Sequence, residues 1–118
     1  MSKLLPVVAW IYSIYFILTG IWPIVSIRSF MAVTGPKTDI WLVRTVGLLV
    51  TAVGLTIACA AAQHSFTTPI LVLAISSSLA LLCIDNIYVF RGVISRIYLV
   101  DAAAEALLIV AWLLAWFA

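Results

Sequence analysis

The residues of this chain that could carry out chemistry are carboxylic acids concentrated in one stretch. Three of the four acidic residues lie between Cys83 and Glu105, and the sequence on both sides is almost wholly apolar. These acids are Asp85, Asp101 and Glu105. Ionisable side chains are costly inside a membrane, so we expect them to have partners or a function there. Because paired carboxyl groups are suited to general acid–base catalysis, the three acids are the candidate catalytic residues.

The cations near these acids limit how their charges can be neutralised. Arg44 is expected at a similar depth, since it lies ~6 Å past the start of its predicted helix. One arginine neutralises one carboxylate, so at least one acid is expected to keep its proton near neutral pH. Glu105 is the candidate, because it lies one helical turn deeper than Asp101 and close to that like charge. A neutral carboxylic acid at this position is suited to proton transfer.

Two interpretations of the acids remain open. In the first they belong to a structural network, in which Arg44 pairs with Asp85 or Asp101, and other polar side chains satisfy the remaining lone pairs. In the second they belong to a polar pocket near the cytoplasmic side. The residues predicted to bind a substrate or ligand there are Arg44, Asn86, Tyr15, Thr19, Trp22 and Tyr88.

The elements that must position these side chains are four long apolar segments. Hydrophobic residues make up 67% of the 118 residues and charged residues 8%, whereas ordinary soluble domains contain about 25% charged residues. A helix needs ~20 apolar residues to cross a bilayer. We therefore predict an all-α integral membrane protein with one domain, residues 1–118, folded as an antiparallel four-transmembrane-helix bundle. The predicted helices cover residues 4–22, 40–62, 69–90 and 97–117, with an interfacial loop at 23–39.

Each predicted helix has one face suited to the interior of a bundle. The second helix carries small residues at spacings of three and four, a pattern that lets membrane helices approach closely. The acids fall on the matching faces of the third and fourth helices. The four faces are Tyr12, Tyr15, Thr19 and Trp22; Arg44, Gly47, Thr51, Gly54 and Ala58; Ala74, Ser78, Leu81, Asp85 and Tyr88; and Asp101, Glu105, Leu108 and Trp112.

The distribution of cations predicts the orientation of the chain in the membrane. Five of the six lysines and arginines belong to the first and third loops and the adjoining helix ends. Both loops are therefore predicted in the cytoplasm and both termini outside. The N-terminal apolar run ends in Ile21, Trp22 and Pro23 rather than in a cleavage site, so it is predicted to stay as a helix. Ile24–Val33 is predicted to lie at the interface as an amphipathic segment.

Other kinds of site are not indicated. Cys59 and Cys83 lie inside apolar runs and are predicted to be buried, inert thiols. His64 has no second histidine or nearby acid, so no metal site is predicted. The sequence contains no nucleophile elbow, no phosphate-binding glycine loop, no cofactor motif and no basic face for nucleic acid.

One stretch resembles a known group of proteins. Trp22–Leu49, WPIVSIRSFMAVTGPKTDIWLVRTVGLL, is similar to a sequence that recurs in uncharacterised small four-helix bacterial membrane proteins. The overall plan is loosely similar to DoxX-like four-helix proteins. The resemblance implies a location in the bacterial cytoplasmic (inner) membrane, and it supplies no activity or catalytic residue.

Three classes of function remain open. The first is a protein that binds a lipid-like or small hydrophobic molecule, or an accessory subunit of a larger membrane complex. The second is a membrane-embedded acid–base enzyme, an isomerase or hydrolase, acting on a hydrophobic substrate. The third is a small proton-coupled transporter, for which an acid would be expected in the first helix, where there is none. The expected partners are membrane lipids, a small hydrophobic ligand, and further copies of the chain or a larger complex.

Overall fold

The computed structural model describes residues 3–118, which form five helices joined by short connections. Four of the helices are long and apolar enough to cross a membrane. This confirms the predicted all-α bundle of four spans; residues 1 and 2 of the predicted domain lie outside the described part. The helices are α1 (Leu4–Val25), α2 (Ile27–Thr34), α3 (Ile40–Ala62), α4 (Thr68–Phe90) and α5 (Tyr98–Phe117).

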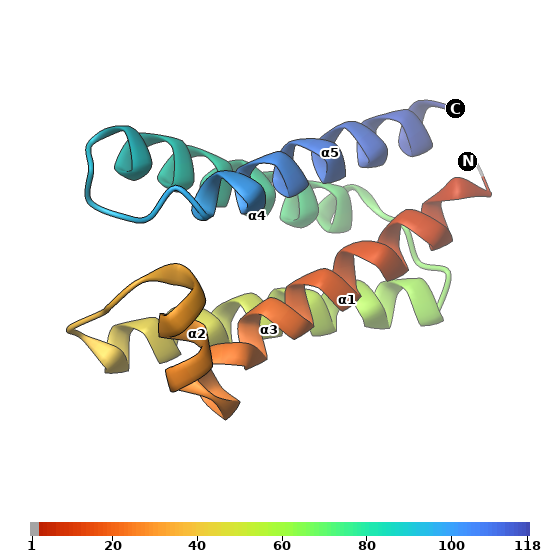
Figure 1. The fold of residues 1–118 in the computed structure, drawn as a ribbon. Helices are drawn as coiled ribbons and strands as arrows, with labels where there is room; N and C mark the ends of the chain where they lie inside the picture. The colour runs from red at the N-terminus through yellow and green to blue at the C-terminus, as the bar shows by residue number, and fades with distance from the viewer. Residues whose placement is uncertain (1–2) are drawn as a thin grey trace.

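The bundle consists of two helix pairs. α1 packs most extensively against α3, and α4 against α5. Figure 1 shows the two pairs as layers, with α1 running diagonally so that its beginning lies near α5 and its end lies away from it. One end of the bundle carries both termini and the connection between α3 and α4. The opposite end, called the α2 end below, carries α2 and the connection at residues 91–97.

The segment between the first two spans is more ordered than the predicted loop at 23–39. α1 continues to Val25, and a separate helix, α2, follows after Ser26. The Ser26 N–H still donates to the Trp22 carbonyl at 2.9 Å, which closes α1. Gly35 follows α2 with a φ of 101°, a conformation that favours glycine. The short helix therefore ends there, and the chain turns back toward the bundle.

Glycines set the distance between α1 and α3. A Cβ atom on Gly47 would lie 2.5 Å from the carbonyl oxygen of Gly20, and one on Gly20 would lie 2.6 Å from that of Gly47. About two turns further along α3, a Cβ on Gly54 would lie 2.8 Å from the Ile17 side chain. The predicted small-residue face of the second span therefore forms a close helix contact at Gly47 and Gly54, whereas Arg44, predicted on the same face, is exposed.

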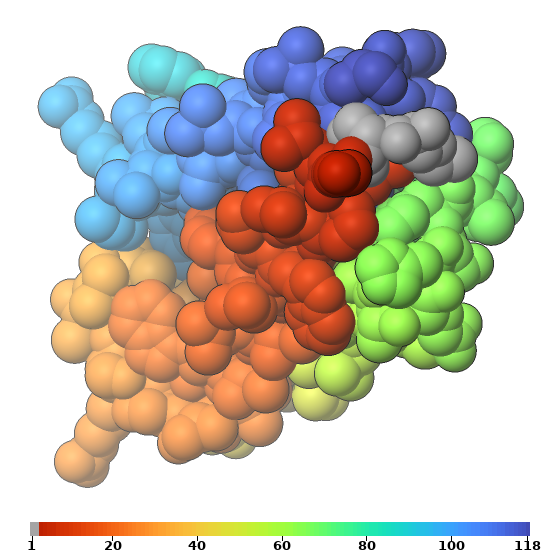
Figure 2. Space-filling view, turned by 90° about the vertical axis from the view of Figure 1, so that its right-hand side faces the viewer, coloured from red at the N-terminus to blue at the C-terminus, as the bar shows by residue number. Residues whose placement is uncertain are grey.

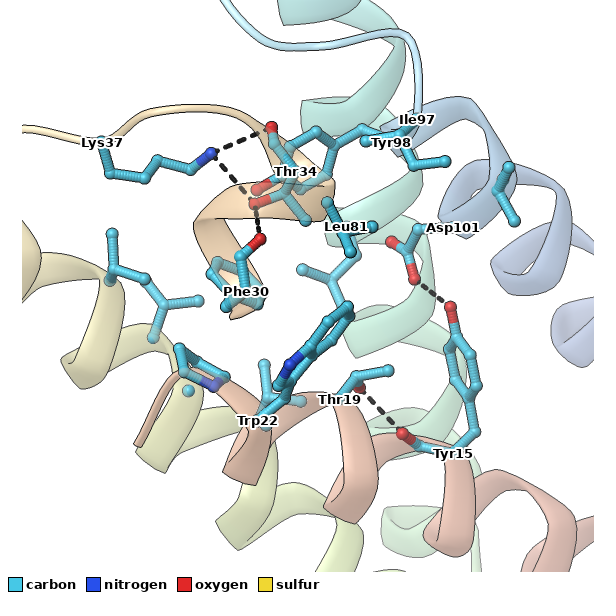
Figure 3. A pocket seen from close by; sticks show the side chains of 18 residues that line it. Tyr15, Thr19, Trp22, Phe30, Thr34, Lys37, Leu81, Ile97, Tyr98 and Asp101 are labelled. Carbon is cyan, nitrogen blue, oxygen red and sulfur yellow. Dashed lines mark hydrogen bonds between the residues drawn. The ribbon is translucent and has the colours of Figure 1, made fainter. Parts of the chain in front are cut away.

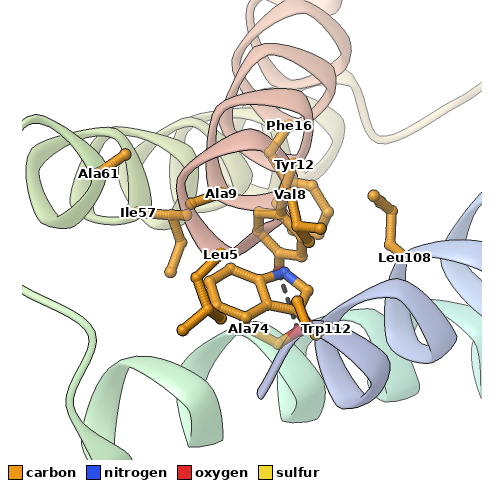
Figure 4. Packing of buried hydrophobic residues seen from close by; sticks show 11 residues of the cluster. Leu5, Val8, Ala9, Tyr12, Phe16, Ile57, Ala61, Ala74, Leu108 and Trp112 are labelled. Carbon is orange, nitrogen blue, oxygen red and sulfur yellow. Dashed lines mark hydrogen bonds between the residues drawn. The ribbon is translucent and has the colours of Figure 1, made fainter. Parts of the chain in front are cut away.

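An aromatic core closes the end of the bundle that carries the termini. Tyr12 stacks on Phe16, with 4.1 Å between ring centroids, and meets the edge of Trp112 at 6.1 Å. The Tyr12 hydroxyl donates to the carbonyl of Ala74 at 3.1 Å, so three helices join at one side chain (Figure 4). Viewed from this end, α1 occupies the middle, with the last part of α5 above it (Figure 2).

The outer faces of the long helices are apolar. Leu18, Leu49 and Leu107 are 64%, 63% and 71% exposed, on three different helices. Such extensive exposed apolar surface is typical of contact with lipid, and the chain is a small multi-pass membrane protein. Cys59 and Cys83 are also exposed and unpaired, so the prediction of buried thiols was wrong. Their positions in apolar runs reflect lipid-facing surface rather than core.

Gly47→Ala should destabilise the protein, because the new methyl group would meet the backbone of Gly20 and push α1 away from α3. We expect a loss of about 1–3 kcal/mol in the free energy of unfolding in detergent micelles. Ala52→Val, at an exposed position of the same helix, is the control and should change little. Equal stability of the two variants would show that the glycine contact does not hold the pair together.

Candidate functional site

A cavity of about 500 Å³ lies between the two helix pairs at the α2 end. Its walls come from the last turns of α1, from α2, from the first half of α3 and from the start of α5, with Leu81 of α4 at its inner end. Most of the lining is apolar. Figure 3 shows the cavity with Trp22 and Thr19 on one wall, Asp101 on the opposite side and Lys37 at its outer edge.

The cavity exists because α1 and α3 are held together while α1 diverges from α5. Gly20 and Gly47 line it at the point of closest contact. On the walls, Val43, Val46 and Val100 present short side chains that do not reach across to the other pair. The bulky aromatic residues of the core lie at the other end of the bundle. The volume at the α2 end therefore stays unfilled by the chain itself.

Asp101 is the acidic residue that lines this cavity among the residues described. It lies in the first turn of α5, where the positive end of the helix dipole favours a carboxylate. The Tyr15 hydroxyl donates to its Oδ1 atom across the boundary between α1 and α5. Thr19 also lines the cavity but donates to the carbonyl of Tyr15 at 2.8 Å, within its own helix.

Two further acids lie behind the cavity wall. Asp85 is 4% exposed and Glu105 is fully buried. The carboxyl of Asp101 is close enough to interact directly with both of them. Ser78 donates to Oε1 of Glu105 at 2.9 Å. Within residues 3–118, one oxygen of Asp85 and one of Glu105 accept no hydrogen bond from an N–H or hydroxyl donor, so the interaction with Asp101 is the polar contact open to them.

The structure thus brings together the three acids that sequence analysis proposed as catalytic residues. It also places Tyr15, Thr19 and Trp22 on the cavity wall, where a ligand-binding role was predicted for them. Whether these residues act in catalysis or binding stays a prediction. Their convergence follows from helical periodicity, since each residue belongs to the face predicted to point inward.

Arg44 does not join the acids. Its side chain is exposed, and no cation acts on Asp85 or Glu105 in the described chain. The interpretation in which Arg44 pairs with one of the acids was therefore wrong. Arg44 lies one helical turn before Gly47, where α3 contacts α1, and its side chain stays outside that contact. The hydroxyl groups of Tyr15 and Ser78 donate to Asp101 and Glu105 instead.

Asn86 and Tyr88 also lie outside the cavity. The Asn86 amide donates to the carbonyl of Leu82 at 2.8 Å, which is a bond within its own helix. Tyr88 is half-buried and is not part of the lining. Both residues follow Asp85 on α4, which contributes to the cavity at Leu81.

Sequence analysis did not single out the residues at the outer edge of the cavity. These come from α2, the following turn and the start of α5, and the turn at Gly35 brings Lys37 back over α2. The signal available in the sequence was the Thr-Gly-Pro-Lys run, which predicts a chain reversal. The residues concerned are Phe30, Thr34, Lys37, Ile97 and Tyr98.

The side chains of the cluster do not suggest a metal centre. Within residues 3–118 no group of three or more His, Cys, Asp or Glu side chains is arranged to hold a metal ion. In comparisons with known proteins, no family model, no curated protein and no solved structure matches the chain. The arguments about function therefore rest on the geometry of the cavity and the acids.

Ser78→Ala should reduce stability, because it leaves the buried carboxyl of Glu105 without its hydroxyl donor. The expected loss is about 1–3 kcal/mol, measured by chemical unfolding in detergent micelles. Ser76→Ala is the matched control, since Ser76 is exposed and bonds only to carbonyls of its own helix. We expect its effect to stay below about 0.5 kcal/mol; similar losses in both variants would argue against the bond as a stabilising contact.

Proposed function

We propose that this membrane protein binds a lipid-like or small hydrophobic molecule in the cavity between its two helix pairs. The observation that carries the proposal is the cavity itself, whose volume of about 500 Å³ falls in the range of ligand sites, ~300–1,000 Å³. Its lining combines apolar walls with a few convergent polar groups, the composition typical of such sites. Asp101 and Tyr15 supply polar groups on one side, and Lys37 supplies one at the outer edge.

We further propose that the α2 end faces the cytoplasm and that both termini lie outside, in a bacterial inner membrane. The proposal is supported by the cations, since Arg28, Lys37, Arg44, Arg91 and Arg96 all belong to segments at the α2 end. Cytoplasmic loops are enriched in lysine and arginine. The resemblance of Trp22–Leu49 to small bacterial membrane proteins agrees with this location. The cavity would then be reached from the cytoplasmic side of the membrane.

A second candidate function, an acid–base enzyme such as an isomerase or hydrolase, is supported by Asp101. A general acid or base must lie within hydrogen-bond reach of the proton that it transfers. Asp101 lines the cavity, so it would act on a bound molecule directly, while Asp85 and Glu105 would act only through it. If the protein is an enzyme, Asp101→Asn would co-purify with a different molecule from the wild type. An identical molecule in both would favour binding alone.

Leu81→Trp should abolish ligand binding, because the larger ring would fill the inner end of the cavity. We expect mass spectrometry of gently purified wild-type protein to find a retained hydrophobic molecule near one per chain, and the variant to lose it. Leu79→Trp is the control, since Leu79 is exposed on the same helix outside the cavity. Retention by both variants, or by neither variant nor the wild type, would contradict the proposal. A stoichiometric protein in place of the molecule would support the accessory-subunit alternative.

The orientation can be tested with single cysteines in a background in which Cys59 and Cys83 are replaced by serine. Gln63 and Ser95 are exposed in connections at opposite ends of the bundle. A membrane-impermeant maleimide should label Gln63→Cys in intact bacterial cells, and Ser95→Cys only after lysis. The reverse labelling pattern would show that the protein has the opposite orientation, and it would leave the proposed binding unaffected.

A further inference from the structure

We propose that Lys37 is a head-group site, and that the ligand of the cavity is a single-chain amphiphile with an anionic head, a carboxylate or a phosphate. This inference rests on the proposed binding function and adds the chemical class of the ligand. In this arrangement the head lies against Lys37 at the outer edge, and the hydrocarbon chain lies along the apolar walls toward Leu81.

The first support is that the ammonium group of Lys37 is hydrogen-bonded to neutral acceptors only. Its Nζ atom donates to the Thr34 carbonyl at 3.2 Å, to the Thr34 hydroxyl at 3.3 Å and to the Gly35 carbonyl at 3.1 Å. All three acceptors are neutral, and in the described chain no carboxylate neutralises the ammonium group. Lys37 is half-buried, and a partly desolvated charge is stabilised best by an opposite charge. The protein orients this cation but leaves its charge uncompensated.

The second support is the way in which the ammonium group is held. Lys37 Nζ lies 5.8 Å from the centroid of the Phe30 ring and 5.2 Å from that of Tyr98. These rings come from α2 and α5, so the lysine lies between the two layers rather than extending into solvent. Figure 3 shows its side chain directed toward Thr34 at the edge of the cavity. A fixed cation between aromatic rings provides a defined position for an anionic head.

The third support is the polarity along the cavity. Lys37 lies in the connection after α2, outside the membrane-spanning helices, whereas Leu81 and Val50 lie within α4 and α3. Apart from Asp101 and Tyr15 on one side, the lining thus changes from a cation at the edge to apolar side chains further in. An amphiphile in a membrane has the same arrangement, with its head at the interface and its chain in the hydrocarbon region.

The volume of the cavity and the acidic residue in its lining limit the choice of ligand further. A volume of about 500 Å³ lies in the range of sites that hold one ligand of moderate size, ~300–1,000 Å³. A single hydrocarbon chain is the occupant that this volume favours. Lys37 is the cation among the lining residues, whereas the carboxyl of Asp101 offers no positive charge to an anionic head. The lysine is therefore the group that suits the head.

The experiment compares three probes of equal chain length: palmitate, hexadecyl phosphate and the uncharged hexadecanol. The protein is reconstituted in nanodiscs of zwitterionic phosphatidylcholine, and bound probe is measured by native mass spectrometry as a function of concentration. We expect Lys37→Gln to weaken binding of both anionic probes by about tenfold or more, the loss of one charge-assisted contact. Binding of hexadecanol should change by less than about twofold. The ratio of palmitate to hexadecyl phosphate binding in the wild type tells which head the site prefers.

Arg44→Gln and Arg91→Gln are matched controls, since both arginines are exposed cations at the α2 end that do not line the cavity. Neither change should affect the anionic probes. If all three variants weaken anionic binding equally, surface charge alone attracts the probes and the head-group site is refuted. If Lys37→Gln binds all probes like the wild type, Lys37 only caps α2 and the inference fails, while binding of hexadecanol still supports the cavity. Failure of every probe to bind the wild type would overturn both the head-group site and the proposed binding in the cavity.

Discussion

The contact between α1 and α3 at Gly20 and Gly47 determines the shape of the rest of the bundle. It brings two helix backbones together at the α2 end, where ordinary side chains would hold them apart. At the other end, Tyr12 and Trp112 fill the centre and hold α1 against α4 and α5. A helix that is drawn toward α3 at one end and toward α5 at the other must run diagonally (Figure 1). The cavity is the space that this diagonal leaves open.

The acids show a second constraint, which is the cost of ionisable groups inside a membrane. One interpretation of the sequence paired an acid with Arg44, the arginine of the second span. Instead, hydroxyl groups of Ser78 and Tyr15 donate to Glu105 and Asp101, and the acids interact with one another. Hydroxyl donors stabilise carboxyl groups in either protonation state, because a hydroxyl can donate or accept. This arrangement leaves Arg44 exposed on the outside of the bundle.

The cavity therefore has two polar regions with different origins. Asp101 and Tyr15 belong to the long helices and reach the cavity from its side. Lys37 belongs to the short connection after α2 and reaches it from its edge. Between them the walls are apolar. Such a distribution is suited to a molecule with one charged end. It separates the cation, Lys37, from the three acids.

The amino-acid sequence by itself determined the membrane setting, the four spans and most of the inward faces of the helices. These depend on apolar length and on a helical repeat of 3.6 residues, both of which are local properties. The convergence of Asp85, Asp101 and Glu105 followed from the same repeat. Only the tertiary structure decided which pairs of helices approach closely, because that depends on backbone contacts between distant residues. It thereby decided that Arg44 faces outward, that Lys37 reaches the cavity, and that the cavity exists at all.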